Sequence, residues 1–393
     1  MRTIFHCDIN NCFASIEMAM NPALRCFPVA VCGDPALRRG IVLAKSELAK
    51  KCGVATGDPL WLARQKCPQI RFVLPHFDVY EQYCRSIRRY YAQYTPLVEP
   101  FGLDECWLDL SGYADNAVSA QLELADRMRE DIKRLFDVTI SVGISFNKVF
   151  AKLGSDMKKP DAVTYIGKDR FRDQIWGLPV SALLGVGRSS NEKLHRSGIL
   201  TIGALALSDR NFIRAMLGKN GLMIWEFANG LDESPVTSQR EPRQSLGHGT
   251  TLPQDAHCSA DLWPVIQKLS QRIAFELQDE GLVARGMQIY VRDCTLMFHQ
   301  YQMGISFGIE ASAVIADYAL MMLSQHYTWV LPVRAFGIRL FHLEQKNVPR
   351  QRSLFENRQQ LQRDLKNSAI DRTICEIQKH FGSSIIERGS CVE

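Results

Sequence analysis

The stretch FGLDECWLDL, residues 101–110, places two adjacent acids, Asp104 and Glu105, inside an apolar run. Such a run is typical of a buried strand, and burying an uncompensated carboxylate is costly. Neighbouring residues on a regular strand also point to opposite faces, so both acids can reach one site only if the strand twists or bulges there. The fold must therefore bring a cation to the end of a buried strand.

Composition sets broad limits on the fold. The chain has 393 residues, of which 46% are hydrophobic and 23% charged. These values are ordinary for a globular protein, and the length allows two to four domains. No apolar run approaches the roughly 20 residues that span a bilayer, and Asp8 interrupts the short apolar patch at the amino terminus. We therefore expect a cytoplasmic protein without a membrane partner.

Cysteine spacing and net charge add little about function. The 12 cysteines form no CxxC pair, so we expect reduced thiols that mostly fill small core positions. The net charge of +5 permits a polyanionic partner without requiring one, and no segment has a strong basic excess.

The first half of the chain alternates between strand and helix patterns, which favours an α+β fold with helices packed on a small sheet. Period-two or continuous apolar runs predict strands at residues 2–9, 27–33, 40–46, 101–110 and 138–145. Helical patterns predict helices at residues 10–20, 78–94 and 121–136.

The second half reads as a further α+β unit. Residues 177–200 suggest short helices punctuated by glycine, and the polar stretch 232–245 is typical of a linker. Beyond it, strands at 286–294 and 333–343 alternate with helices near 261–280 and 311–326. A polar tail follows residue 350, with a terminal helix at 369–381.

Three acids at strand edges, Asp8, Asp104 and Glu105, are the strongest chemical signal. A single such acid usually caps a turn or pairs with a lysine. Two strands of one sheet can bring three together, and clustered carboxylates are usually neutralised by a divalent cation. Oxygen ligands select Mg²⁺ or Mn²⁺, and two such ions support phosphoryl or nucleotidyl transfer. Spacing alone leaves both readings open.

Three segments resemble the palm motifs of the Y-family translesion DNA polymerases, most closely the bacterial DNA polymerase IV branch. They are CDINNCFASIE (7–17), FGLDECWLDLSG (101–112) and SVGISFNKVFAKLGSDMKKPD (141–161), and the similarity extends from residue 1 to about 345. The three motifs occur in order and at the family's spacing, which makes the resemblance specific.

The resemblance implies a monomeric right-hand polymerase with an α+β fold. Its parts would be a ferredoxin-like palm, small fingers, a helical thumb with a helix–hairpin–helix, and an α+β little finger. The corresponding ranges are palm 1–24 and 78–166, fingers 25–77, thumb 167–231, linker 232–244, little finger 245–345 and tail 346–393.

The implied reaction is template-directed DNA synthesis. A dNTP would be added to a primer 3′-hydroxyl with two Mg²⁺ ions (Mn²⁺ being possible), at low fidelity and low processivity, to copy past lesions. Asp8 and Asp104 would bridge both ions and Glu105 would hold the ion that activates the hydroxyl. The carbonyl of Ile9 would complete the nucleotide-side ion.

Nucleotide contacts are also implied by the resemblance. Phe13 matches the steric gate that excludes a ribose 2′-hydroxyl, and Lys159 matches a lysine on the triphosphate. The fingers segment KSELAKKCG departs from the family pattern, because Glu47 stands at a tyrosine position and Lys50 at an arginine position. Lys50 remains a point charge for phosphate and Lys45 could compensate for Glu47, so we expect weakened nucleotide affinity.

DNA contacts are expected in the thumb and the little finger. Gly185 and Gly187 lie in a segment that resembles a helix–hairpin–helix, where backbone N–H groups approach a phosphate. The arginines expected on DNA are Arg240, Arg243, Arg285, Arg292, Arg334 and Arg339.

The tail segment QRSLF, residues 351–355, resembles the bacterial sliding-clamp (beta) motif. Gln351, Leu354 and Phe355 would enter a pocket on the clamp, although matches of five residues also arise by chance. Two further readings are an idle DNA-binding relative and another two-metal palm enzyme such as a nucleotide cyclase. The three retained acids disfavour the first, and the thumb, little finger and tail disfavour the second.

Overall fold

Two separate units make up the chain in the computed structural model, which describes residues 2–35, 40–112, 117–239, 242–346, 358–382 and 386. The first unit comprises residues 1–33 and 40–240, and the second comprises residues 34–39 and 241–393. Among the described residues, no helix is long and apolar enough to cross a membrane.

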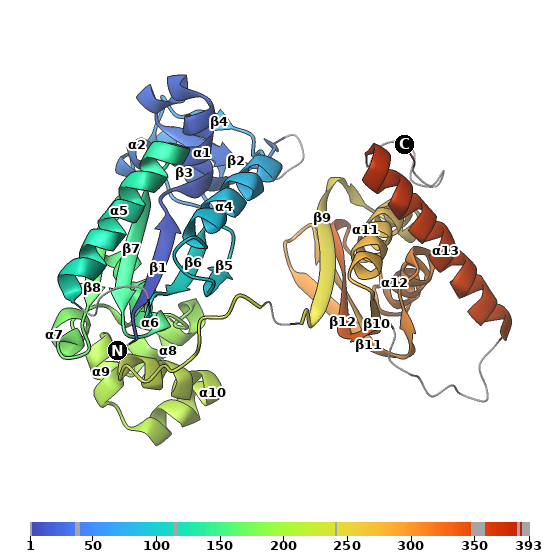
Figure 1. Ribbon diagram of the computed structural model, residues 1–393. Coiled ribbons are helices and arrows are strands. Elements are labelled where there is room, and N and C mark those ends of the chain that lie inside the picture. Colours follow the sequence, from blue (N-terminus) through green and yellow to red (C-terminus); the bar gives the residue numbers. More distant parts are fainter. Residues whose placement is uncertain are drawn as a thin grey trace. The chain divides into compact units, whose positions relative to one another are not determined.

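A five-stranded sheet forms the centre of the first unit (Figure 1). Its strands, in spatial order, are β5 (Val98–Phe101), β6 (Glu105–Asp109), β1 (Ile4–Ile9), β7 (Ile140–Ser145) and β8 (Val163–Ile166). Helix α4 (Phe77–Tyr91) connects β1 to β5, and α5 (Val118–Phe136) connects β6 to β7. This β-α-β-β-α-β order, with β1 antiparallel to β6 and β7, is the predicted ferredoxin-like arrangement.

The two faces of β1 carry different residues. Phe5, Cys7 and Ile9 point into an apolar core shared with α4 and α5. The alternate residues, including His6 and Asp8, face helix α6 (Lys148–Met157), and their side chains contact residues in and just beyond that helix. The strand is buried along its whole length.

Helix α6 approaches the sheet unusually closely because of Gly143 in β7. A Cβ at this position would lie 1.8 Å from the carbonyl oxygen of Ala151, a distance no side chain can occupy. Gly154 of α6 packs against Gly143, since a Cβ added at Gly154 would lie 3.2 Å from the Cα of Gly143. The absence of side chains here allows lysines on and after α6 to reach the end of β1.

A small lobe follows β1. It comprises α1 (Cys12–Met20), the 3₁₀ helix η1 (Pro22–Cys26), α2 (Glu47–Lys51), α3 (Leu60–Lys66), and a sheet of β3 (Val42–Lys45), β2 (Val29–Cys32) and β4 (Arg71–Val73). The predicted strands at 27–33 and 40–46 are confirmed as the antiparallel pair β2–β3.

Short helices complete the first unit after β8: α7 (Phe171–Ile175), η3 (Val180–Ala182), α8 (Arg188–Arg196), α9 (Ile202–Leu207) and α10 (Arg210–Ala228). The first part of the predicted linker is packed against the central sheet. Val236 is only 3% exposed and lies in a cluster with Trp107. The N–H of Thr237 donates to Glu99 at 3.0 Å, which fixes this stretch beside β5.

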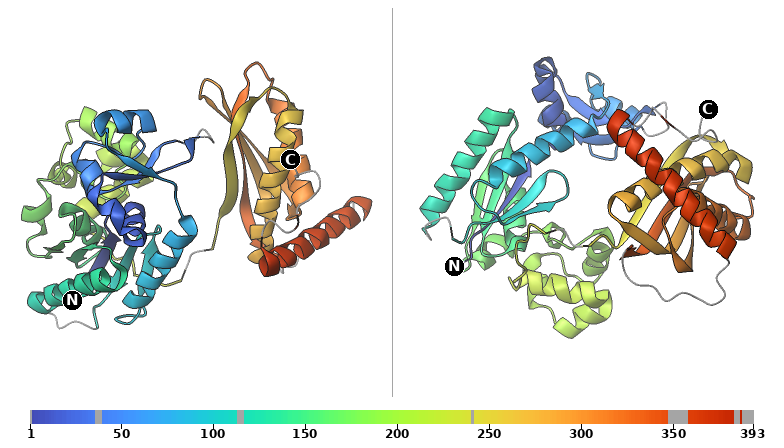
Figure 2. Two further views of the ribbon diagram at one scale, coloured as in Figure 1. Left: turned by 90° about the horizontal axis from the view of Figure 1, so that it is seen from above. Right: turned by 45° about the vertical axis from the view of Figure 1, so that its right-hand side comes forward.

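The second unit contains a four-stranded antiparallel sheet with helices on one face (Figures 1 and 2). Its elements are β9 (Ser245–Ala256), α11 (Ser259–Asp279), β10 (Leu282–Asp293), β11 (Phe298–Ile309), α12 (Ser312–His326) and β12 (Val333–Gln345), with strand order β11-β10-β12-β9. The predicted strands and helices of this region are confirmed.

The terminal helix α13 (Arg358–Phe381) starts eleven residues before the predicted start at 369, within the stretch predicted as a polar tail. Its inward stripe includes polar residues, so no apolar period marks it in the sequence. Asp371 accepts hydrogen bonds from the N–H (2.7 Å) and the hydroxyl (2.8 Å) of Ser312, at the start of α12. Ser368 and Cys375 are buried on the same side.

Candidate active site

The acidic pair does not lie on one continuous strand, so the prediction of a single strand over 101–110 is wrong. Strand β5 ends at Phe101, a turn spans residues 102–104, and β6 begins at Glu105. Gly102 makes the turn with φ at +72°, a conformation that favours glycine. Asp104 therefore takes its direction from the turn and Glu105 from the strand, which removes the facing problem without a bulge.

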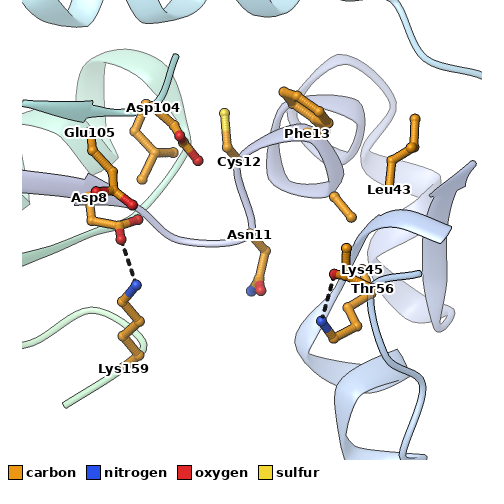
Figure 3. A pocket seen from close by; sticks show the side chains of 12 residues that line it. Asp8, Asn11, Cys12, Phe13, Leu43, Lys45, Thr56, Asp104, Glu105 and Lys159 are labelled. Atoms are coloured by element: carbon orange, nitrogen blue, oxygen red, sulfur yellow. Dashed lines mark hydrogen bonds and ion pairs between the residues drawn. The ribbon is translucent and has the colours of Figure 1, made fainter. Parts of the chain in front are cut away.

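The turn lies beside the end of β1. The N–H of Ile9 donates to the carbonyl oxygen of Asp104 at 3.2 Å, and Asp8 is the direct register partner of Glu105. Tertiary structure thus places Asp8, Asp104 and Glu105 on one wall of a cavity of about 300 Å³. In Figure 3 they lie together on one side, with Phe13 and Lys45 across the opening. The other lining residues are Ile9, Asn11, Cys12, Leu43, Ala44, Thr56 and Lys159.

Lysines neutralise two of the three acids. The ammonium of Lys159 lies 2.6 Å from Asp8 and 2.8 Å from Asp156. The ammonium of Lys152 lies 2.5 Å from Glu105. Among the described residues, no group of three or more His, Cys, Asp or Glu side chains converges as a preformed metal cage.

The pKa values of the acids diverge accordingly. Burial, and then the charges of Asp8 and Glu105, raise the pKa of Asp104 to about 6. Burial alone would also raise the pKa of Glu105, but hydrogen bonds from His6 and Lys152 lower it to about 2. Burial raises the pKa of Asp8 too, against the opposing charge of Lys159. Asp104 is therefore the acid whose negative charge is least compensated.

The wall can hold a hard cation. It offers carboxylate oxygens from two neighbouring strand ends, the donor type that Mg²⁺ and Mn²⁺ prefer. Because burial, and then the charges of Asp8 and Glu105, raise the pKa of Asp104, a cation bound there would relieve an existing cost.

Phe13 sits on α1 with its ring fixed against α4. It stacks on Tyr80 with ring centroids 4.5 Å apart and planes 13° from parallel, and Phe77 meets its edge at 5.8 Å. Tyr80 is itself held, because its hydroxyl donates to the buried carboxylate of Glu17. That carboxylate also contacts the ring of His76 at 2.8 Å. The aromatic wall is rigid as a result.

Of the two lysines predicted to bind the triphosphate from the fingers, only one lines the cavity. Lys45 lines the cavity and donates to the hydroxyl of Thr56 at 3.1 Å (Figure 3). Lys50 is not among the lining residues, has a half-exposed side chain, and lies 3.7 Å from Glu47. Glu47 in turn accepts a hydrogen bond from Asn11 at 2.9 Å. The structure therefore brings Lys45 and Lys159 to the cavity, but not Lys50.

Two residues beside the acids were missed from the sequence, His6 and Lys152. His6 is fully buried, with one ring nitrogen 2.8 Å from the hydroxyl of Ser155 and the other 3.2 Å from Glu105. A signal existed for His6, which precedes Asp8 by two residues and so shares its strand face. For Lys152 the sequence offered only a weak signal, its position four residues before Asp156. The Lys152 ammonium lies 3.6 Å from the Asp156 carboxylate.

The thumb glycines form a turn before α8. Gly185 has φ at +89°, and Gly187 occupies the N-cap position of α8. Added side-chain atoms at Gly185 would meet Ile224 and Met223 at 3.1 Å, so its backbone packs tightly on α10. This is the geometry expected of a turn that presents N–H groups at a helix start.

The little-finger arginines make contacts within their own unit. Arg243 pairs with Glu276 (3.1 Å) and Glu280 (3.2 Å), and Arg285 pairs with Glu344 (2.8 Å). Of the other predicted DNA contacts, Arg292 lies over the ring of Phe298 at 4.9 Å, Arg339 donates to Ser245 at 2.9 Å, and Arg334 is half-buried. Arg240 and the predicted clamp contacts Gln351, Leu354 and Phe355 lie outside the described residues.

Comparisons with known proteins agree across the chain. The impB/mucB/samB family matches residues 7–156, and the C-terminal domain of that family matches residues 243–354. The chain is 41% identical to DNA polymerase IV of Acetivibrio thermocellus, over 99% of this chain and 97% of that protein. It is 33% identical to DNA polymerase IV 1 of Bacillus subtilis, over 100% of this chain and 94% of that protein.

Solved structures show the same fold. A Y-family DNA polymerase chimera of Dbh and Dpo4 superposes with a TM-score of 0.78 at 22% identity, covering 87% of this chain and 99% of that chain. An insertion ternary complex of Dbh DNA polymerase gives a TM-score of 0.62, also at 22% identity, over 86% of this chain and 98% of that chain.

Proposed function

Because this chain belongs to the impB/mucB/samB family of Y-family DNA polymerases, we propose that it is a DNA-directed DNA polymerase of the DNA polymerase IV type. It would extend a primer 3′-hydroxyl with dNTPs and copy past lesions at low fidelity. The observation that carries the proposal is the cavity with Asp8, Asp104 and Glu105 on one wall and Phe13 and Lys45 opposite. We keep the domain division as palm 1–24 and 78–166, fingers 25–77, thumb 167–231, linker 232–244, little finger 245–345 and tail 346–393.

Two divalent ions, Mg²⁺ or Mn²⁺, would be held by Asp8, Asp104, Glu105 and the carbonyl of Ile9. When bound, such ions lower the pKa of the primer hydroxyl and stabilise charge on the departing pyrophosphate. The protein's own contribution is to bring the three carboxylates together and to hold them in position. Glu105 is held by Lys152 and His6, and Asp8 by its register pairing within β1 and β6.

The incoming nucleotide would lie between the acids and the aromatic wall. Phe13 would exclude a 2′-hydroxyl, since the stack on Tyr80 prevents its ring from moving aside. Lys159 and Lys45 would bind the triphosphate, because both line the cavity and a lysine ammonium binds phosphate as a point charge. Lys50 could contribute only after leaving Glu47, which agrees with the expectation of weak nucleotide affinity.

Primer-template DNA would be held without sequence readout by the turn at Gly185 and Gly187 and by little-finger arginines. Because Arg243 and Arg285 already pair with carboxylates, phosphate must compete for them, and binding should weaken steeply with salt. We further propose a monomer acting in the cytoplasm and tethered to the sliding clamp through residues 351–355.

A primer-extension assay tests this function. Wild-type protein with dNTPs and Mg²⁺ should extend a primer on undamaged and on abasic-site templates, and Asp104→Ala should abolish extension. Asp173→Ala, which removes an exposed acid at the start of α7, is the matched control and should retain activity. No extension by the wild type would exclude a polymerase, and extension by Asp104→Ala would exclude the metal assignment.

Sugar selectivity is a separate readout for Phe13. Phe13→Ala should incorporate ribonucleotides at least tenfold more readily relative to deoxynucleotides. Unchanged selectivity would remove Phe13 from the role of gate while leaving the polymerase function intact.

A further inference from the structure

Four cysteines lie together on the sheet face opposite α6, next to the acidic wall. Cys7 and Cys106 are direct register partners in β1 and β6, and both are buried. Cys12 of α1 and Cys84 of α4 bring their sulfur atoms to 3.8 Å. These two cysteines are 72 residues apart in the sequence, and their thiols form a contact between helices α1 and α4.

The two thiols of the closest pair differ in access. Cys12 lines the active-site cavity, and Figure 3 shows its sulfur between Asp104 and the ring of Phe13. Cys84 is not a lining residue and is only 1% exposed. A small solute in the cavity can therefore reach Cys12 first, with Cys84 directly behind it.

We propose that Cys12 and Cys84 are a redox modification site that takes hydrogen peroxide or a similar small peroxide. The Cys12 thiol gives up its proton as its sulfur attacks one peroxide oxygen, the O–O bond breaks, and a sulfenic acid and water form. The Cys84 thiol then attacks that sulfur, the S–O bond breaks, a disulfide forms, and a second water leaves. Two thiols are oxidised and one peroxide is reduced to two waters, and an added dithiol reverses the change.

The disulfide would disturb the active site. Sulfur atoms at 3.8 Å must approach to about 2.05 Å, which draws α1 toward α4. The same two helices carry the stacked rings of Phe13 and Tyr80. We therefore expect oxidation to displace Phe13 and reduce nucleotide addition at least tenfold. This consequence rests on the proposed polymerase function, whereas disulfide formation does not.

Peptide mass mapping tests the site on the full-length protein. After treatment with hydrogen peroxide and alkylation of free thiols, a peptide pair linked through Cys12 and Cys84 should appear and vanish with dithiothreitol. The proposal would be overturned if Cys12 and Cys84 were both recovered as alkylated free thiols after a peroxide treatment that oxidises the exposed Cys26. So would Cys12 recovered only as a sulfenic, sulfinic or sulfonic acid.

Matched variants connect the bond to activity. Cys84→Ala should keep basal primer extension and lose peroxide sensitivity. Cys67→Ala, which removes a buried fingers thiol that does not line the cavity, should keep both basal activity and sensitivity. Equal peroxide sensitivity of Cys84→Ala and wild type would overturn the proposal. If neither the wild type nor any variant extends primers even when reduced, the proposed polymerase function is wrong. The peptide mapping would still show whether Cys12 and Cys84 form a disulfide.

Discussion

Asp104 costs the protein stability, and replacing it should make the metal-free protein more stable while abolishing activity. The pKa of this carboxyl is raised from 3.8 to about 6, first by burial and then by the charges of Asp8 and Glu105. A raised carboxyl pKa means that ionisation is harder in the folded state than in the unfolded state. The free-energy penalty is fully present above about pH 6 and is relieved as the pH falls toward 3.8.

The size of the penalty follows from the shift. About two pKa units correspond to about 3 kcal/mol, at about 1.4 kcal/mol for each unit. Because the cavity admits solvent, we expect Asp104→Asn to recover only about 1–2 kcal/mol at pH 8. For a unit of this size, that raises the melting temperature by about 2–8 °C.

Thermal and urea unfolding of the full chain without divalent ions provides the measurement. The stability difference between Asp104→Asn and wild type should shrink as the pH is lowered from 8 to 4. Millimolar Mg²⁺ should raise the melting temperature of the wild type but not of the variant, since a ligand stabilises only the state that binds it.

A control with the opposite sign is available in the same unit. Lys66 and the N–H of Ala55 lower the pKa of Asp58, so Asp58→Asn should destabilise the protein. If Asp104→Asn also destabilised the protein, or if its effect did not depend on pH, then the carboxylate would not be under electrostatic strain. The case for a missing cation would then fail.

Two further predictions concern the support of the site. Gly143→Ala places a methyl group 1.8 Å from the Ala151 carbonyl and should cost about 3 kcal/mol or more in unfolding free energy, measured by urea denaturation. Gly304→Ala, where the added atom meets open space, should cost far less, and equal costs would contradict the close approach of α6. Lys152→Ala should destabilise the protein by roughly 1–3 kcal/mol at pH 7. Because His6 and Lys152 together lower the pKa of Glu105 to about 2, this loss should fade as the pH falls from about 4.5 toward 2. A loss independent of pH would remove the ion pair as its cause.

Local periodicity explains what was predictable in the fold. The stripe of Tyr80, Cys84, Ile87 and Tyr91 in α4 is buried throughout, as helical spacing indicated. Helix α13 was underestimated because its inward side includes polar groups such as Asp371, and an apolar period cannot reveal those.

At the site, the sequence by itself determined which residues are acidic and that they end apolar segments. It could not determine that a turn at Gly102 directs Asp104, because the alternative of a bulged strand has the same composition. It also named both Lys45 and Lys50 as nucleotide contacts, and of these two the tertiary structure brings only Lys45 to the cavity.

The physical reason is the range of the interactions. Strand and helix periods act over two to four residues and are written locally in the chain. The contacts that define the site join residues far apart, such as Lys159 to Asp8 and Cys12 to Cys84, across 151 and 72 positions. Such pairs depend on how closely α6 and α4 pack on the sheet, and only the assembled core sets that distance.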